Sequence, residues 1–285
     1  MSEEMPLKSP LRNVLLTIAY DGSGFSGWQR QPNQRTVQGE LERVLSHLCG
    51  EEIALNGVSR TDAGVHALGQ RASFTGGFGI PAERIPAAAN NLLEDIRIVC
   101  AEEMPPGFRI RDAVRAKTYV YRMAWAEGGT LAPLFLRNYF AWLPAAPDAA
   151  RVRAAAAALV GTHDFAAFQS AGGMPRETTV RTIYKAKVLS NTCLPACFSS
   201  LDFADKRDNS GFSGFDFAVT GDGFLYNMVR IMAGTLIECG LGQRDPVEMA
   251  DILRSADRRR AGHTAPSQGL YLKEVFFDQE NADLD

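Results

Sequence analysis

The chain has 285 residues, of which 46% are hydrophobic and 22% are charged. This length and composition predict a soluble globular protein with room for two domains of ordinary size, and they exclude an intrinsically disordered chain. The formal net charge of −3 is unusual for a nucleic-acid-binding protein, because phosphate contacts usually leave an excess of basic residues.

The sequence gives no indication of export, membrane insertion or metal binding. The opening residues, MSEEMPLKSPLRN, lack the apolar core of a signal peptide, and no later segment offers the roughly 20 apolar residues that a bilayer requires. We therefore expect a cytoplasmic protein. Cysteine and histidine residues are dispersed without metal-ligand spacing, so we expect reduced thiols and no metal. These residues are Cys49, Cys100, Cys193, Cys197, Cys239, His47, His66, His163 and His263.

The first part of the chain is predicted to be α/β in character. The β-branched run at residues 14–20 predicts a strand that ends at the turn Asp21-Gly22. Thr36 is a suitable N-cap for an amphipathic helix that Gly50 ends. The next predicted elements are a strand at 71–74, a helix at 81–93 that is interrupted or restarted at Pro86, and a strand at 96–100.

The segment GVSRTDAGVHALGQ, from Gly57 to Gln70, is the best candidate for a functional loop. Arg60 and Asp62 lie two residues apart between small and turn-forming residues, with no hydrophobic run to bury them. Catalytic groups are frequent on ordered loops of this kind, so Asp62 is the leading candidate for chemistry. The alternative is that Asp62 only accepts backbone N–H bonds within a turn.

The second part begins with a predicted strand at 117–125, in which Tyr119 and Arg122 point to opposite faces. On this pattern alone, Tyr119 is more typical of a core residue. Residues 190–213 are polar and lack a clear period, so we expect an exposed insertion there. The remaining predicted elements are helices at 148–160 and 226–238, a further helix after Asp245-Pro246, and strands at 182–189, 214–220 and 269–277.

A basic stretch offers a way to reconcile the acidic net charge with an RNA partner. Its only acidic residue is Asp112, and its members form either a basic stripe or an ordinary solvated strand face. They are Arg109, Arg111, Arg115, Lys117 and Arg122.

The motif GxxRTDxGVHxxGQ at residues 57–70 resembles the signature of the TruA-type tRNA pseudouridine synthases. The resemblance covers nearly the whole chain, through AYDGSGFSGWQRQPNQRTVQGELE near the start, KTYVYR at 117–122, FLYNMVRIMAGTLIECGLG at 224–242 and GLYL at 269–272. It implies an α+β fold, the pseudouridine synthase fold, with two similar α/β domains whose mainly antiparallel sheets join around a central active-site cleft. We place an N-terminal domain at 11–112 and a C-terminal domain at 113–280.

The same resemblance implies the isomerisation of uridine to pseudouridine in the anticodon stem-loop of tRNA, at positions 38–40, by a homodimer that needs no cofactor. It makes Asp62 the catalytic nucleophile, lays Tyr119 against the target uracil and assigns Arg60 to RNA contact. Arg230 lies in the arginine motif of an otherwise apolar helix, and we expect it to pair with Asp62. From the residues alone, Arg230 could instead be a helix-edge arginine that reaches solvent.

Two other functions are alternatives to this one. An RNA-binding or tRNA-folding protein of the same fold that lacks catalysis would retain the overall pattern, although the RTD, YxY and MVR segments argue for catalysis. A hydrolase using Ser59 and His66 would need a GxSxG elbow, which the sequence lacks. The GSGFSG stretch at 22–27 is not GxGxxG followed by a helix, so a dinucleotide site is not expected.

Overall fold

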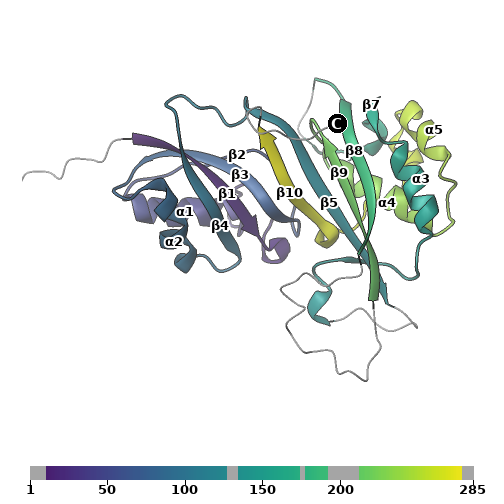
Figure 1. The fold of residues 1–285 in the computed structure, drawn as a ribbon, viewed down its shortest axis with the longest axis horizontal. Helices are drawn as coiled ribbons and strands as arrows, with labels where there is room; N and C mark the ends of the chain where they lie inside the picture. Colours follow the sequence, from purple (N-terminus) through teal and green to yellow (C-terminus); the bar gives the residue numbers. More distant parts are fainter. Residues whose placement is uncertain (1–10, 127–133, 174–176, 192–211, 278–285) are drawn as a thin grey trace, which may run out of the picture. The chain divides into compact units, whose positions relative to one another are not determined.

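The computed structural model describes residues 11–126, 134–173, 177–191 and 212–277, and these divide into two compact units. Unit 1 comprises residues 11–115 and 272–277, and unit 2 lies within residues 116–271. The chain crosses between the units inside β5 (Val114–Ala126) and again inside β10 (Leu270–Phe277). Both units combine helices with mainly antiparallel strands, which confirms the α+β class (Figure 1).

The sheet of unit 1 has the strand order β4-β1-β3-β10, and the short β2 also pairs with β3. Strand β1 is antiparallel to both β3 and β4, and a bulge interrupts its pairing with β3 between Ile18 and Tyr20. The bounds are β1 (Leu11–Tyr20), β2 (Asn56–Gly57), β3 (His66–Gly77) and β4 (Ile96–Met104).

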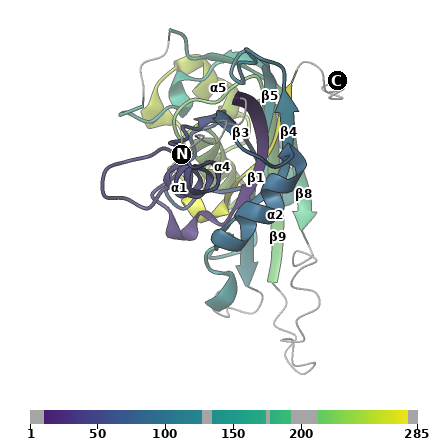
Figure 2. The ribbon, with the colours of Figure 1, turned by 90° about the vertical axis from the view of Figure 1, so that its left-hand side faces the viewer.

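Helix α1 (Val37–Cys49) has the predicted limits because its end residues satisfy the terminal backbone groups. The Thr36 side chain accepts a hydrogen bond from the N–H of Gly39, and Gly50 ends the helix with φ of 68°. Its buried face includes Leu41 and Leu45. Figure 2 views α1 along its axis, with β1 beside it.

The helix predicted at 81–93 is broken into three short pieces. They are η2 (Ala82–Arg84), α2 (Ile85–Ala89) and η3 (Asn90–Leu92), and α2 packs against β4. Pro86 lies in the first turn of α2, where its missing N–H costs nothing. The predicted interruption or restart of the helix at Pro86 is therefore confirmed.

The sheet of unit 2 has the strand order β5-β9-β8-β7, and the short β6 pairs with β5 in parallel. Helix α3 packs against both α4 and β8. The bounds are β6 (Ala141–Trp142), β7 (Gly161–Asp164), β8 (Val180–Asn191), β9 (Phe212–Gly221), α3 (Ala149–Ala157), α4 (Met228–Gly240) and α5 (Glu248–Ser255), with 3-10 turns η1 (Gly22–Gly24), η5 (Leu134–Leu136), η6 (Ala166–Phe168), η7 (Arg258–Arg260) and η8 (Ser267–Gly269).

The insertion expected at 190–213 falls mainly on residues 192–211, which lie outside the described residues.

None of the helices in the described residues has the length and apolar character needed to cross a membrane.

Candidate active site

The loop that carries Asp62 connects β2 to β3 in unit 1, and its backbone is held from inside the unit. The N–H of Trp28 donates to the carbonyl oxygen of Thr61 at 3.0 Å. The hydroxyls of Thr61 and Tyr20 lie 2.7 Å apart and share a hydrogen bond. Thr61 is buried, whereas Arg60 is exposed and Asp62 is half-buried. The loop therefore anchors its central residue and leaves the two charged neighbours nearer the surface.

A tight turn places Asp62 at the point where the chain enters β3. The N–H of Val65 donates to the carbonyl oxygen of Asp62 at 3.1 Å, and Gly64 has φ of 75°. Gly27 packs against the outside of this turn with φ of 96°. A Cβ on Gly27 would lie 2.7 Å from the carbonyl oxygen of Thr61, so only glycine permits this approach.

The buried amide of Gln70 fixes the start of the same loop. Its Nε2 donates to the carbonyl oxygen of Ser59 at 2.6 Å, and its Oε1 accepts from the N–H of Ser59 at 3.2 Å. Gln70 lies on β3, so the strand and the loop are tied together across Ser59. The Asp62 loop is thus supported on both sides of the carboxylate, as a preorganised catalytic group requires.

His66 forms a hydrogen bond with the backbone of Gly22, and it does not form the Ser59–His66 pair that a hydrolase would need. Its ring is buried, and Nδ1 accepts from the N–H of Gly22 at 3.1 Å. Oδ1 of the Asp21 carboxylate lies 3.3 Å from the same ring nitrogen. Among the described residues, the buried Ser59 hydroxyl has no hydrogen-bond partner. The arrangement lacks the nucleophile–base bond of a hydrolase.

Tyr119 lies on β5 in unit 2, opposite Val219 of β9. Its ring is 8% exposed and meets the ring of Phe224 edge-on, with centroids 5.1 Å apart and an interplanar angle of 80°. Such edge-to-face contacts orient an aromatic ring. The ring of Tyr119 is therefore fixed by a residue close to the start of α4.

Arg122 follows Tyr119 on β5 and points to the other face, as the alternation predicts. It lies opposite Asp216 in the register and pairs with it at 3.2 Å. Its guanidinium also covers the ring of Phe140 at 4.5 Å. Arg122 therefore does not extend an exposed basic stripe, whereas Arg111 and Arg115 are exposed.

Arg230 is held in the first turns of α4 by two groups of unit 2. Its Nε donates to the carbonyl oxygen of Ala265 at 2.8 Å, and its Nη1 donates to Oδ1 of Asn227 at 2.9 Å. The N–H of Ala265 donates back to the carbonyl oxygen of Arg230 at 3.1 Å. Arg230 is partly buried, and these bonds hold its guanidinium against unit 2.

Tyr121 supports the same region from β5. Its hydroxyl donates to the carbonyl oxygen of Pro266 at 2.9 Å, one residue after the contact of Arg230. Burial raises the pKa of Tyr121 far above its usual value, and the positive charge of Arg230 opposes this shift only in part. Tyr121 therefore remains a protonated hydrogen-bond donor.

The four predicted site residues fall into two groups. Arg60 and Asp62 share one loop of unit 1, and Tyr119 and Arg230 belong to unit 2. The ion pair between Asp62 and Arg230 stays a prediction. No group of three His, Cys, Asp or Glu side chains within the described residues is placed to hold a metal ion.

Sequence reasoning missed the residues that support the site. Gln70 closes the GVHxxGQ motif, and Asn227 precedes Arg230 by one helical turn, so both were visible as polar residues at fixed spacing. Phe224 and Tyr20 carried no such signal, because an aromatic residue next to a turn looks like ordinary core.

Comparisons with known proteins identify the family of this chain. A family model described as tRNA pseudouridine synthase matches residues 16–111 and 155–278. The chain belongs to the tRNA pseudouridine synthase family. The matched ranges include Arg60, Asp62 and Arg230, whereas Tyr119 lies between them.

Curated relatives in this synthase family cover almost the whole chain. A tRNA pseudouridine synthase A of Caldicellulosiruptor bescii is 39% identical over 269 residues, which is 94% of this chain and 100% of the relative. The tRNA pseudouridine synthase A 2 of Clostridium tetani is 42% identical over 94% of this chain and 99% of its own length. A tRNA pseudouridine synthase A of Bacillus pumilus is 42% identical, with 93% and 99% covered.

Proposed function

We propose that this chain isomerises uridine to pseudouridine in tRNA, with Asp62 as the catalytic nucleophile. The observation that carries the proposal is the construction of the Asp62 loop. Thr61 is fixed by Trp28 and Tyr20, and the half-buried carboxylate follows it in a tight turn within the RTD motif. Membership of the synthase family supports the same reaction.

The isomerisation of uridine to pseudouridine can be carried out with a carboxylate, a tyrosine and arginines alone. The C1′–N1 bond breaks, the uracil turns, a C1′–C5 bond forms, and the proton lost from C5 is balanced by one gained at N1. No electrons or groups are transferred to another molecule, so the chemistry needs no cofactor. Asp62 serves as a covalent nucleophile, either at the base or at the sugar C1′, and both routes remain open.

Arg230 and Tyr119 have complementary roles in this proposal. A guanidinium beside Asp62 would keep the carboxylate ionised in a site dry enough for the chemistry. The ring of Tyr119 would stack on the extruded uracil, and its hydroxyl would take the C5 proton. The edge contact with Phe224 and the bonds to Ala265 and Asn227 support these roles, because they hold both side chains in defined positions.

The exposed Arg60 would contact the RNA backbone or brace the gap left by the flipped nucleotide. The resemblance of the sequence motifs further supports the anticodon stem-loop as the target, with positions 38–40 as the modified uridines. It also supports a homodimer that acts in the cytoplasm.

Replacement of Asp62 tests the proposal directly. Asp62→Asn keeps the size of the side chain and removes the nucleophile, so release of tritium from tRNA labelled at C5 of uridine should fall on the order of 10⁴-fold. Binding of tRNA should change by less than about twofold, because Arg60 and the remaining contacts persist.

Asp112→Asn is the matched control, since it removes one exposed carboxylate of unit 1 that pairs with Arg109 in the same short segment. It should leave tritium release unchanged. If Asp62→Asn releases tritium at the wild-type rate, Asp62 is not the catalytic nucleophile. A wild-type protein that binds tRNA without releasing tritium would favour the non-catalytic RNA-binding alternative.

A further inference from the structure

Residues 261–266 belong to no helix or strand, yet they hold the side chain of Arg230. Ala265 accepts from Nε of Arg230 at 2.8 Å and donates its own N–H to the carbonyl oxygen of Arg230 at 3.1 Å. One residue of this segment therefore contacts both the backbone and the guanidinium of Arg230. Any group that fixes the segment also fixes the direction of that guanidinium.

One face of α4 contacts the segment along its length. Arg230, Gly234 and Glu238 recur at four-residue intervals and so lie on the same side of the helix. A Cβ on Gly234 would clash with the carbonyl oxygen of His263, so the segment is in direct backbone contact with α4. The N–H of Gly262 donates to the hydroxyl of Thr235 at 2.9 Å.

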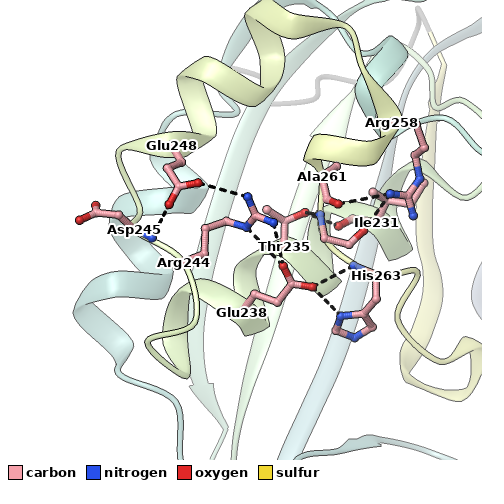
Figure 3. A network of polar contacts seen from close by, with 10 residues as sticks. Ile231, Thr235, Glu238, Arg244, Asp245, Glu248, Arg258, Ala261 and His263 are labelled. Carbon is pink, nitrogen blue, oxygen red and sulfur yellow. Dashed lines mark hydrogen bonds and ion pairs between the residues drawn. The ribbon is translucent and has the colours of Figure 1, made fainter.

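Glu238 provides the charged anchor of this contact (Figure 3). Its Oε1 accepts from the backbone N–H and from Nδ1 of His263, each at 2.9 Å. Its Oε2 accepts from Nε and Nη2 of Arg244 at 3.3 and 3.2 Å. The carboxylate is 17% exposed, so these charge-assisted bonds are partly shielded from water. Arg244 in turn pairs with Glu248 on α5 at 3.3 Å.

We propose that Glu238 is a positioning residue for Arg230. Its carboxylate anchors His263, and the segment 261–266 then presents the carbonyl of Ala265 that orients the guanidinium. Glu238 lies eight residues along α4 from Arg230, roughly 12 Å at the rise of an α-helix, so it acts through the segment. The inference rests on the proposed function, in which Arg230 serves the reaction.

Exchange of the Arg230 Nε–H with water, followed by NMR, tests the positioning without an activity assay. Arg230→Lys identifies the signal by its loss. Glu238→Ala should raise the exchange rate about tenfold or more, because the segment loses the acceptor of both His263 bonds. Glu238→Gln keeps an acceptor for the N–H of His263 and should restore most of the protection.

Glu248→Ala is the matched control, because it removes the outer partner of Arg244 and leaves the bond between Glu238 and His263 in place. It should change the exchange rate by less than about twofold. A folded Glu238→Ala protein with unchanged exchange would overturn the proposal. If Glu238→Ala does not fold, Glu238→Asp replaces it, because it keeps the charge and draws the carboxylate back from His263 by one methylene. Unchanged exchange in a folded Glu238→Asp protein would then overturn the proposal.

A double-mutant cycle connects this positioning to turnover. Glu238→Ala should lower kcat for tRNA about tenfold and change KM by less than about twofold. In an Arg230→Lys background, which has no Nε–H to orient, Glu238→Ala should cost nothing further. If Glu238→Ala lowers kcat by the same factor in the wild-type and Arg230→Lys backgrounds, the inference is contradicted. A wild-type protein without tritium release would instead refute the proposed function, and the exchange measurement would still report on the positioning.

Discussion

At the scale of single residues, the backbone around Asp62 is determined by close contacts that admit few substitutions. Gly27 illustrates this, because its positive φ and its approach to the carbonyl oxygen of Thr61 both require the absence of a Cβ. The neighbouring Trp28 donates to the same carbonyl group. The position of the carboxylate therefore depends on residues more than 30 positions away in the sequence.

Gly27→Ala should lower both stability and turnover. The left-handed backbone and the contact of 2.7 Å with Thr61 should cost about 1–3 kcal/mol of unfolding free energy. Displacement of the Asp62 turn should reduce tritium release more than it reduces tRNA binding. Gly79→Ala is the control, since a Cβ there meets no atom within 4 Å and its φ is not positive. Equal stability of the two variants, measured by urea unfolding, would refute this account.

The sequence singles out candidate site residues because chemistry restricts residue type. Asp62, Arg60, Tyr119 and Arg230 occur in short motifs, although the strand pattern around Tyr119 also fits a core residue. Their supporting contacts could not be predicted in the same way. The bond between Tyr20 and Thr61 depends on strand pairing and on a bulge in β1, which no local pattern encodes.

At the scale of elements, prediction succeeded where a cap or a period was present. Helix α1 has the limits set by Thr36 and Gly50, and α3 begins after the N-cap Asp148. Strand β3 is longer than the predicted 71–74, because pairing with β1 extends it through residues of low β propensity. The two-residue strand β6 and the four-residue strand β7 are too short to produce a recognisable period.

The contact between α4 and the segment 261–266 should make stability depend on pH in the acidic range. Burial raises the pKa of Glu238, but the hydrogen bonds from His263 and Arg244 outweigh it and hold the pKa below the usual value of 4.5. A carboxyl group with a lowered pKa in the folded state stabilises the protein fully above its unfolded value. That stabilisation is lost as the pH falls through the folded value.

Glu238→Gln should therefore weaken the fall of the unfolding free energy with decreasing pH in the acidic range. The measurement is the midpoint of urea unfolding, taken at intervals from about pH 6 to pH 3. Glu177→Gln, which removes an exposed carboxyl group of unit 2, should keep the wild-type slope. A Glu238→Gln profile parallel to that of the wild type would show that these hydrogen bonds contribute nothing to the pH dependence.

At the scale of the whole molecule, the net charge of −3 coexists with an RNA substrate in the proposed function. Many arginines are neutralised locally, as the pair of Arg259 with Asp257 at 2.7 Å shows. Arginines that already pair with a neighbouring carboxylate then contribute less to the attraction of phosphate groups. Binding should therefore depend on the position of a few arginines more than on total charge.

The affinity for tRNA should fall steeply with salt, and Arg60 should contribute one phosphate contact to that dependence. Arg60→Ala should reduce the slope of log K against log salt concentration by about 0.7–0.9. Arg259→Ala should leave the slope unchanged, because Asp257 already balances that charge. The slopes can be compared by filter binding at several KCl concentrations. Identical slopes for Arg60→Ala and the wild type would exclude a phosphate contact at Arg60.

The return of the chain to unit 1 in β10 has a consequence for biosynthesis. Residues 272–277 are translated after all of residues 116–271, although they complete the sheet that begins with β1. The unit whose sequence leaves the ribosome first is therefore the last to acquire all of its strands. Until then the edge of β3 lacks its neighbour, and a nascent chain stalled before residue 270 should be prone to aggregation or chaperone capture at that edge.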